Sequence, residues 1–320
     1  MKAIVVRKFG DPEVMKLEEV PKPEVGTSQV LVRIKAAGVN PVDTYIRSGF
    51  YPVKPDLPYT PGKDGAGVVE EIGEEVKKFK VGDRVFLSGS LTGTYAEFAL
   101  CQETQVHHLP ERISFEQGAG VFIPYATAYR ALFQKAKAKP EETVLIHGAS
   151  GGVGIAAIQW AKNAGLKILG TASSEEGKKL VLEQGADFVF DHLKENYLQE
   201  ILEVTGGVGV HIILEMLANA NLMKDLEVLT KHGRIVIIGS RGTLEFDPRA
   251  TMTKDASIFG MSLFNASEAD MQEILSAIEK GLSEGFLNPV VGTAFPLEEA
   301  AEAHYRIIMK KAFGKIVLLP

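Results

Sequence analysis

A glycine-rich segment, HGASGGVG at residues 147–154, has the residue types and the spacing of a phosphate-binding loop. Gly148, Gly151 and Gly154 follow a short apolar run and precede an alanine-rich one, so a strand is expected to turn into a helix here. Glycines let the backbone approach a pyrophosphate, and the first N–H groups of a helix attract anions. A turn without a ligand is the alternative, but this turn opens a series of alternating strands and helices. The segment therefore predicts a dinucleotide site.

The residues after the next expected strand indicate which dinucleotide binds. An NAD site commonly carries Asp or Glu about 20 residues beyond the glycines, where it holds the ribose 2′-hydroxyl. Here the strand is followed by Ser173 and Ser174, and Lys178 comes one turn later. A hydroxyl and a cation suit a 2′-phosphate, which favours NADPH. Two alternatives stay open: Ser173 with Glu176 could cap the next helix, and Glu175 or Glu176 could reach a ribose hydroxyl.

A second set of polar residues lies in the first part of the chain. Asn40, Tyr45 and Arg47 follow an expected strand that ends near Ala37. A tyrosine there can pack beside a nicotinamide ring or donate a hydrogen bond to a substrate carbonyl. A buried core tyrosine is the simpler alternative for Tyr45, and Arg47 can instead pair with Asp43. We take Asn40, Tyr45 and Arg47 as candidate catalytic residues.

Composition limits the classes of protein to consider. A chain of 320 residues suits two domains, and a net charge of −6 excludes a chain-wide basic footprint for nucleic acid, though not a local patch. The single cysteine, Cys101, can form neither an internal disulfide nor a four-cysteine zinc site. The sequence has no apolar run of membrane-spanning length, and residues 1–7 do not resemble a signal peptide. We therefore expect a cytoplasmic protein without a membrane partner.

The pattern of apolar residues divides the chain. Up to about residue 123 it reads as strands and turns: residues 30–36 alternate with period two, and residues 65–73 and 81–86 are apolar runs cut by glycine. This is typical of an antiparallel, barrel-like β domain. Later, strands alternate with helices, which predicts a parallel, doubly wound sheet and an α/β fold. The expected strands are 143–148, 167–171, 187–190, 211–215, 234–239 and 256–263, and the expected helices are 152–164, 175–184, 196–204 and 221–231.

The end of the chain differs again. Residues 268–285 and 297–311 are expected to be helical, and residues 314–320 read as a strand. A strand that follows the α/β unit is expected to return to the sheet of the first domain.

Several long segments together resemble the zinc-independent quinone oxidoreductases of the medium-chain dehydrogenase/reductase superfamily, in the zeta-crystallin group. They include GVNPVDTYIRSG (38–49), LPYTPGKDGAGV (57–68), IPYATAYRAL (123–132), HGASGGVG and LEMLANANLMKDL (214–226). The resemblance implies a GroES-like β-barrel catalytic domain over 1–123, a Rossmann NADP-binding domain with a six-stranded doubly wound parallel sheet over 124–263, and a return to the catalytic domain over 264–320. It also implies that NADPH binds in a cleft between the domains.

The resemblance also assigns site residues. It supports Tyr45, Asn40 and Arg47 as catalytic, and it places Thr127 at a helix start, where an N-cap role is the alternative. Ser173 stands where the group has a glycine, and His192 can stack on an adenine or cap a loop. The implied cofactor contacts are Tyr45, Thr127, Ser150, Gly151, Gly152, Val153, Ser173, Lys178, His192, Asn221, Ile238, Gly239, Ser240, Arg241, Met261, Ser262 and Leu263.

No metal site is expected. Zinc-dependent members of the superfamily carry a cysteine and a later Gly-His-Glu, and the corresponding residues here are Asn40 and Gly62, Lys63, Asp64. Asparagine is a poor zinc ligand, and a protonated lysine cannot coordinate. The four cysteines of the structural zinc lobe are missing. His107 and His108 are adjacent, so they point to opposite faces of a strand.

The resemblance implies NADPH-dependent reduction of quinones, ortho-quinones included, by one-electron steps that give semiquinones. One alternative is an NADPH-dependent alkenal or enone reductase in which Tyr45 donates the proton. Another is an NADPH-binding crystallin or RNA-binding protein with little catalysis. We also expect a homo-oligomer, a dimer or a tetramer, because the apolar sixth strand of the sheet would lie at an exposed edge.

Overall fold

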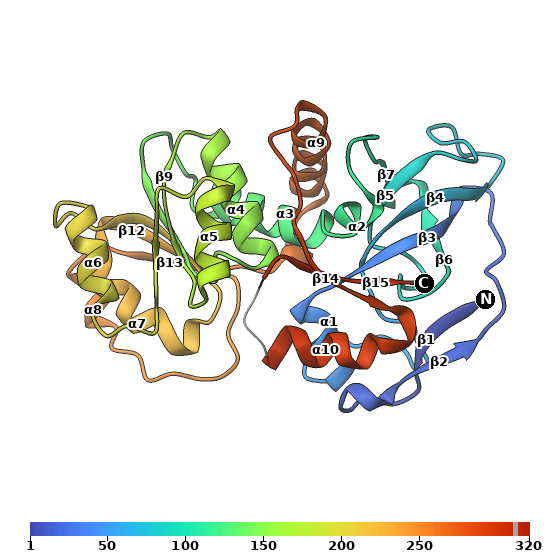
Figure 1. Cartoon of the computed structure of the whole chain (residues 1–320), viewed down its shortest axis with the longest axis horizontal. Helices are drawn as coiled ribbons and strands as arrows, with labels where there is room; N and C mark the ends of the chain where they lie inside the picture. Colours follow the sequence, from blue (N-terminus) through green and yellow to red (C-terminus); the bar gives the residue numbers. More distant parts are fainter. Residues whose placement is uncertain (310–312) are drawn as a thin grey trace. The chain divides into compact units, whose positions relative to one another are not determined.

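The computed structural model describes residues 1–309 and 313–320. The chain forms two compact units (Figure 1). The first combines Met1–Ile123 with Asn288–Pro320, and the second is Pro124–Leu287. Among the helices that the structure describes, none has the length and hydropathy of a membrane span.

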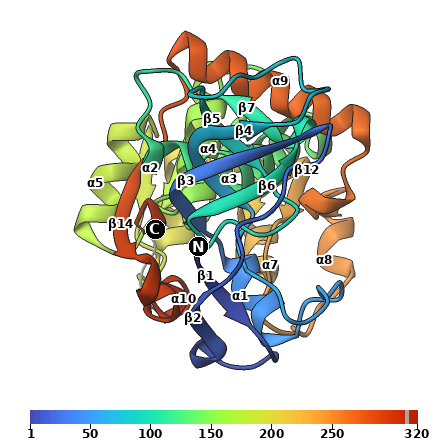
Figure 2. The same ribbon diagram turned by 90° about the vertical axis from the view of Figure 1, so that its right-hand side faces the viewer.

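The first unit is built around a seven-stranded sheet. Its strands are β14 (Val291–Pro296), β15 (Lys315–Leu319), β3 (Gln29–Val39), β4 (Asp64–Ile72), β5 (Arg84–Ser88) and β7 (Val106–His108), with β6 (Phe98–Gln102) paired to β3. β3 is central, because it pairs with β4, β6 and β15 (Figure 2). The predicted alternation is confirmed: Val30, Val32 and Ile34 enter the core of this unit. The predicted return of the last strand is also confirmed, since β15 runs antiparallel to β3.

Smaller elements complete the first unit. They are β1 (Lys2–Val6), η1 (Pro12–Val14), β2 (Met15–Glu19), α1 (Pro41–Ser48), η2 (Glu103–Gln105), α2 (Phe115–Gly118), η5 (Leu297–Glu299) and α10 (Ala300–Met309). The helix predicted over 297–311 thus begins as a 3-10 turn, and its last two residues lie outside the described residues. His107 and His108 do point to opposite faces: His107 is buried and stacks on Phe86, whereas His108 is exposed.

The second unit contains a six-stranded parallel sheet, as predicted. The strand order is β10-β9-β8-β11-β12-β13, which is the order 3-2-1-4-5-6 of a Rossmann fold. The bounds are β8 (Thr143–Ile146), β9 (Lys167–Thr171), β10 (Phe188–Phe190), β11 (Val210–Glu215), β12 (Leu229–Ile237) and β13 (Ser257–Gly260). All four residues of β8 are buried, because helices cover a central parallel strand on both faces.

Helices lie on both sides of this sheet (Figure 1). The bounds of the helical elements from residue 122 to residue 284 are α3 (Phe122–Tyr129), the π-helix η3 (Arg130–Lys135), α4 (Gly152–Asn163), α5 (Glu175–Gln184), α6 (Tyr197–Val204), α7 (Ala218–Val228), α8 (Arg249–Met252), η4 (Leu263–Asn265) and α9 (Glu268–Glu284). α5 matches its prediction: it ends at Gln184 and is followed by Gly185 in the left-handed conformation. α7 begins at Ala218 rather than at residue 221.

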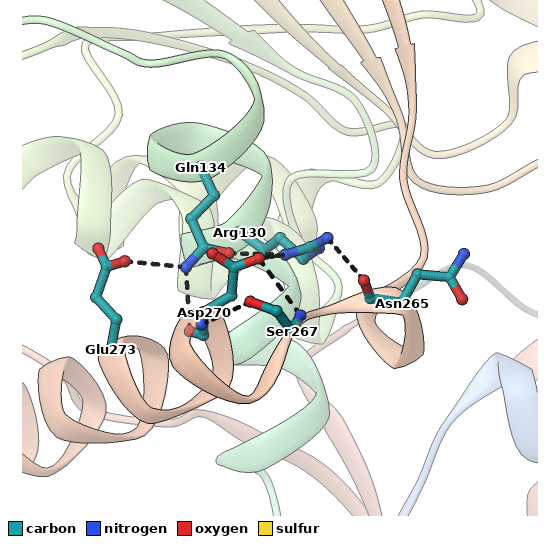
Figure 3. Close-up of polar contacts among 6 residues, drawn as sticks. All are labelled: Arg130, Gln134, Asn265, Ser267, Asp270 and Glu273. Atoms are coloured by element: carbon teal, nitrogen blue, oxygen red, sulfur yellow. Dashed lines mark hydrogen bonds and ion pairs between the residues drawn. The ribbon is translucent and has the colours of Figure 1, made fainter.

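Residues 264–287 belong to the second unit, not to the returning segment that was predicted to begin at residue 264. The reason is a polar cluster that ties α9 to η3 (Figure 3). Nη1 of the buried Arg130 lies 3.1 Å from Oδ2 of Asp270, and Nη2 donates to the carbonyl of Asn265 at 3.3 Å. Nε2 of Gln134 donates to the Asp270 carbonyl and to Glu273. These contacts join residues far apart in sequence, so no local sequence pattern predicts them.

Candidate cofactor and catalytic sites

The glycine loop has the geometry that its sequence predicts. Gly148 has φ +58°, a left-handed conformation that favours glycine, and Gly151 is the N-cap of α4. A Cβ atom on Gly154 would lie 2.5 Å from the Cα atom of Ala149. α4 therefore packs directly against the turn that leaves β8, with its N-terminus at the loop.

Most of the predicted cofactor residues meet at one edge of the parallel sheet. They follow the carboxyl ends of its strands, which lie together because all six strands are parallel. These are Ser150, Gly151, Gly152 and Val153 after β8, Ser173 and Lys178 after β9, His192 after β10, Asn221 after β11, Ile238, Gly239, Ser240 and Arg241 after β12, and Met261, Ser262 and Leu263 after β13. Thr127 is different. It lies inside α3, which begins at Phe122, so its expected place at a helix start is wrong.

The structure around Lys178 rejects one alternative, the cap by Ser173, and shows an additional partner of Lys178, Asp191. The cap of α5 is Ser174, whose Oγ accepts the N–H of Gly177 at 3.0 Å, so the predicted capping box of Ser173 is wrong. Nζ of Lys178 lies 2.8 Å from Oε1 of Glu175 and 3.2 Å from Oδ2 of Asp191. Asp191 was missed because it follows the third strand of the sheet, not the second. Lys178 thus neutralises an acid at the end of β10.

Of the predicted catalytic residues, Tyr45 and Arg47 lie on α1 of the first unit and Asn40 is its N-cap. The backbone N–H of Asn40 donates to Oδ2 of Asp43 at 2.9 Å, which fixes the start of the helix. Arg47 does not pair with Asp43: its Nη1 donates to the carbonyl of Gly10 at 2.7 Å. Tyr45 is half-buried, so the structure does not make it a core residue.

Asn40 belongs to a buried polar triangle that includes Lys315. Nζ of Lys315 lies 2.7 Å from Oδ2 of Asp64 and donates to Oδ1 of Asn40 at 2.6 Å. Nδ2 of Asn40 donates to the same Asp64 oxygen at 3.0 Å, and the other Asp64 oxygen accepts the N–H of Ile123. Sequence reasoning missed Lys315, although a single charged residue in the apolar segment KIVLL was a signal.

A second buried chain of polar groups lies beside this triangle. Oδ2 of Asp43 lies 3.3 Å from the hydroxyl of Tyr95, which lies 3.1 Å from Nε2 of His304. Burial raises the pKa of Asp43 to about 6, and the charge of Asp64 adds to this rise. Burial and the charge of Arg47 lower the pKa of His304 to about 3, so its imidazole is neutral. The hydroxyl of Tyr95 therefore joins an acid of raised pKa to a neutral base.

Family models and similar proteins agree on the family of this chain. The alcohol dehydrogenase GroES-like domain model matches residues 26–111, and the zinc-binding dehydrogenase model matches residues 152–280. The quinone oxidoreductase of Homo sapiens is 52% identical over 321 residues, which cover 100% of this chain and 98% of the human one. The chain belongs to the quinone oxidoreductase family. This family lies in the medium-chain dehydrogenase/reductase superfamily, so the expected family and an oxidoreductase activity are confirmed.

Bacterial members of the family align just as completely. The quinone oxidoreductase of Pseudomonas aeruginosa is 36% identical, with 100% of this chain and 99% of the relative covered. The crystal structure of the quinone oxidoreductase of Escherichia coli in complex with NADPH is 31% identical, with a TM-score of 0.89 and all of both chains covered. Both units of this quinone oxidoreductase thus have counterparts in a solved structure.

One of the matching family models is named for zinc binding, but the side chains around Asn40 do not fit a zinc ion. A catalytic zinc site needs sulfur, imidazole or carboxylate ligands that are free to coordinate. In this quinone oxidoreductase the carboxylate of Asp64 and the amide oxygen of Asn40 are both taken by the ammonium group of Lys315. A cation placed by the protein itself therefore occupies the position between these two side chains.

Proposed function

We propose that this chain reduces quinones with NADPH as the reductant. The observation that carries the proposal is the glycine turn after β8, the first strand of a 3-2-1-4-5-6 sheet, with the predicted cofactor residues at the same edge. The human and bacterial relatives named as quinone oxidoreductases, and the E. coli structure in complex with NADPH, support it.

The proposed roles follow from the chemistry of each group. The backbone of Ser150–Val153 holds the pyrophosphate at the N-terminus of α4, where free N–H groups and the helix dipole favour an anion. Lys178, with Ser173, binds the 2′-phosphate. NADPH, when bound, supplies the two electrons of the reduction. His192 stacks on the adenine, and the remaining cofactor contacts hold the nicotinamide half and exclude water.

On the substrate side we assign orientation to α1. Tyr45 is half-buried and can donate a hydrogen bond to a quinone carbonyl. Asn40 does not turn freely, because Lys315 and Asp64 hold both atoms of its amide. Arg47 is anchored to the backbone of Gly10, so its role is to position this end of α1.

We further propose that the reaction needs no zinc, that ortho-quinones are substrates and that reduction proceeds by one-electron steps, so that one NADPH reduces two quinones to semiquinones. The Lys315 ammonium supports the first point, because it already neutralises Asp64. Quinones accept electrons readily and give an aromatic product, so they need less help from a Lewis acid than an alcohol does. Dialysis against a chelator should leave quinone reduction intact. A tightly bound zinc whose removal abolishes turnover would contradict this.

The test of the proposed function is a substrate panel. Ortho- and para-quinones and an α,β-unsaturated ketone are offered with NADPH and with NADH, and turnover is followed by the loss of nicotinamide absorbance. We expect quinones to be reduced with NADPH. Faster turnover of the enone would favour an alkenal or enone reductase with Tyr45 as the proton donor. No turnover, with NADPH still bound, would favour a binding protein.

We also propose a homo-oligomer formed through β13. This strand lies at the edge of the six-stranded sheet, where unpaired N–H and C=O groups can join a second copy. Light scattering at micromolar concentration should show a dimer or a tetramer, and a monomer would refute the proposal.

A further inference from the structure

A buried histidine, His147, lies directly before the glycine loop and outside the predicted set of cofactor residues. Its Nε2 atom lies 2.8 Å from Oδ1 of Asp225 and 3.4 Å from Oε2 of Glu215. The histidine is 3% exposed, and both acids are fully buried. Removing a charge from water is costly unless a partner compensates it, so two buried acids that face one imidazole require an additional positive charge.

The His147 cluster, formed by His147, Glu215 and Asp225, joins three segments of the proposed cofactor site. Nδ1 of His147 lies 3.3 Å from Oγ1 of Thr171 at the end of β9, and this oxygen accepts the N–H of Gly148 at 3.2 Å. Glu215, at the end of β11, accepts a hydrogen bond from the side chain of Asn221 at 3.2 Å. A change of charge in the cluster therefore acts on the start of the glycine loop and on a predicted cofactor contact.

Thr171 can serve both protonation states of His147. Its oxygen uses one lone pair for Gly148, which leaves a second lone pair and the hydroxyl hydrogen for Nδ1. A neutral imidazole accepts the hydroxyl hydrogen, and a charged imidazole donates to the second lone pair. Nε2–H can donate to Oδ1 of Asp225 in either state. A proton on Nδ1 can therefore be gained or lost without moving the heavy atoms.

The balance of charge favours an additional proton in the cluster. With both acids ionised, a charged His147 leaves one net negative charge and a neutral His147 leaves two. Oδ2 of Asp225 and Oε2 of Glu215 accept no hydrogen bond from the described residues. One nitrogen or oxygen atom from each of the three side chains lies within 4.8 Å of the others, so the charge on each group acts on the other two.

The pKa shifts agree with this geometry. Burial lowers the pKa of His147, but the charges of Asp225 and Glu215 outweigh burial, so the pKa is raised overall. Burial raises the pKa of Glu215 to about 7. Besides β11 and α7, which supply the two acids, α6 contributes Tyr197. Burial and the two acids raise the pKa of Tyr197 to about 12, so it stays neutral while the cluster titrates.

We propose that the His147 cluster is a proton-binding site linked to the dinucleotide site, so that NADPH binds more tightly when the cluster holds its additional proton. This inference rests on the proposed NADPH function. NADPH brings several negative charges to the loop that begins at the next residue. Each proton lost from the cluster leaves one more buried negative charge there, which repels the dinucleotide. Linkage is reciprocal, so the bound dinucleotide holds the proton on the cluster.

The test is the dissociation constant for NADPH between pH 6.5 and 9.5, measured by nicotinamide fluorescence, with NADH in parallel because it lacks a 2′-phosphate. We expect the affinity for both to fall by about tenfold as the pH rises, which corresponds to a shift of about one pKa unit on binding. A flat profile for wild type overturns the inference. A chain that binds neither dinucleotide overturns the proposed function, and the inference with it.

Two variants separate the cluster from other titrations. Asp225→Asn keeps the shape and an acceptor for Nε2–H but removes one charge, so the step in affinity should move to lower pH and leave the measured range. His211→Asn is the matched control, since this histidine bonds the backbone of Thr143 and not the cluster; its profile should follow wild type. An Asp225→Asn profile identical to wild type overturns the inference.

A direct measurement covers the case in which Asp225→Asn does not fold. The ring nitrogen signals of His147 in the wild-type chain, followed by NMR, should titrate, and NADPH should move the midpoint to higher pH. An unchanged midpoint overturns the inference. Metal analysis of the same sample tests whether the cluster binds a metal ion instead of a proton. A stoichiometric divalent cation that is present in wild type and lost in Asp225→Asn would mean that the additional charge is a metal, which overturns the inference.

Discussion

Nζ of Lys315 lies 2.7 Å from Oδ2 of Asp64, and both side chains are buried. The lysine comes from the last strand of the chain and the aspartate from β4, yet both reach Asn40 at the start of α1. A buried ion pair is costly to desolvate, so its presence beside a candidate catalytic residue points to a role in orientation. The triangle holds the amide of Asn40 in one orientation.

Replacing Lys315 alone should therefore lower the free energy of unfolding more than replacing Lys315 and Asp64 together. Lys315→Met leaves the Asp64 carboxylate buried without a counter-charge, and we expect it to lower the free energy of unfolding by about 3–5 kcal/mol. The double variant Lys315→Met/Asp64→Asn should recover much of this loss. Lys280→Met, which breaks an exposed pair with Glu284, is the control and should change little. Urea unfolding checks all three, and equal losses in the single and double variants would contradict the expectation.

Asp43 should make stability depend on pH. Its pKa is about 6 in the folded chain and 3.8 as the ordinary value, so the folded state holds its proton when the unfolded state has lost it. The stability that this proton contributes is therefore present below pH 3.8 and is lost as the pH rises towards 6.

Asp43→Asn removes this dependence and still accepts the hydrogen bonds from Asn40 and Tyr95. Relative to wild type, the variant should gain about 3 kcal/mol between pH 4 and pH 7. Urea unfolding at several pH values measures the difference. A difference that does not change with pH would show that Asp43 is ionised in the folded chain throughout this range.

Two glycines of the loop should respond differently to a side chain. Gly151 has an extended backbone, φ −85° and ψ 171°, which valine tolerates, so Gly151→Val should keep the fold and abolish binding of NADPH. Gly154→Ala places a Cβ 2.5 Å from Ala149, and overpacking should cost about 1–3 kcal/mol of stability. Thermal unfolding and fluorescence titration separate the two effects. Normal NADPH binding by a folded Gly151→Val would mean that the loop is only a turn.

Lys178 should carry part of the preference for NADPH over NADH. In the free chain its ammonium already pairs with Glu175 and Asp191, so the 2′-phosphate must compete with these acids. Lys178→Ala should weaken NADPH by about tenfold, because it removes a cation and leaves Asp191 to repel the phosphate. NADH should change little. Asp191→Asn is the opposite control and should favour NADPH further. Equal losses for both dinucleotides would show that Lys178 does not contact the phosphate.

Local sequence patterns were sufficient for much of the fold. Strand and helix alternation gave the Rossmann sheet, because each βα unit is encoded by adjacent residues whose hydrophobic period changes from two to 3.6. The glycine spacing located the turn between β8 and α4 for the same reason. The pattern was less reliable for the exact position of a residue relative to the start of a helix. Ser174, not Ser173, caps α5, and Thr127 lies inside α3 rather than at its start.

The sequence by itself determined the family and the two kinds of domain, and it predicted the edge of the sheet where a dinucleotide would bind. Only the tertiary structure decided that Lys315 pairs with Asp64, that α9 belongs to the second unit and that His147 faces two buried acids. These are contacts between residues distant in the chain. These contacts are strong because they are buried, and charged groups removed from water require partners. Local periodicity in the sequence does not indicate which distant residue becomes the partner.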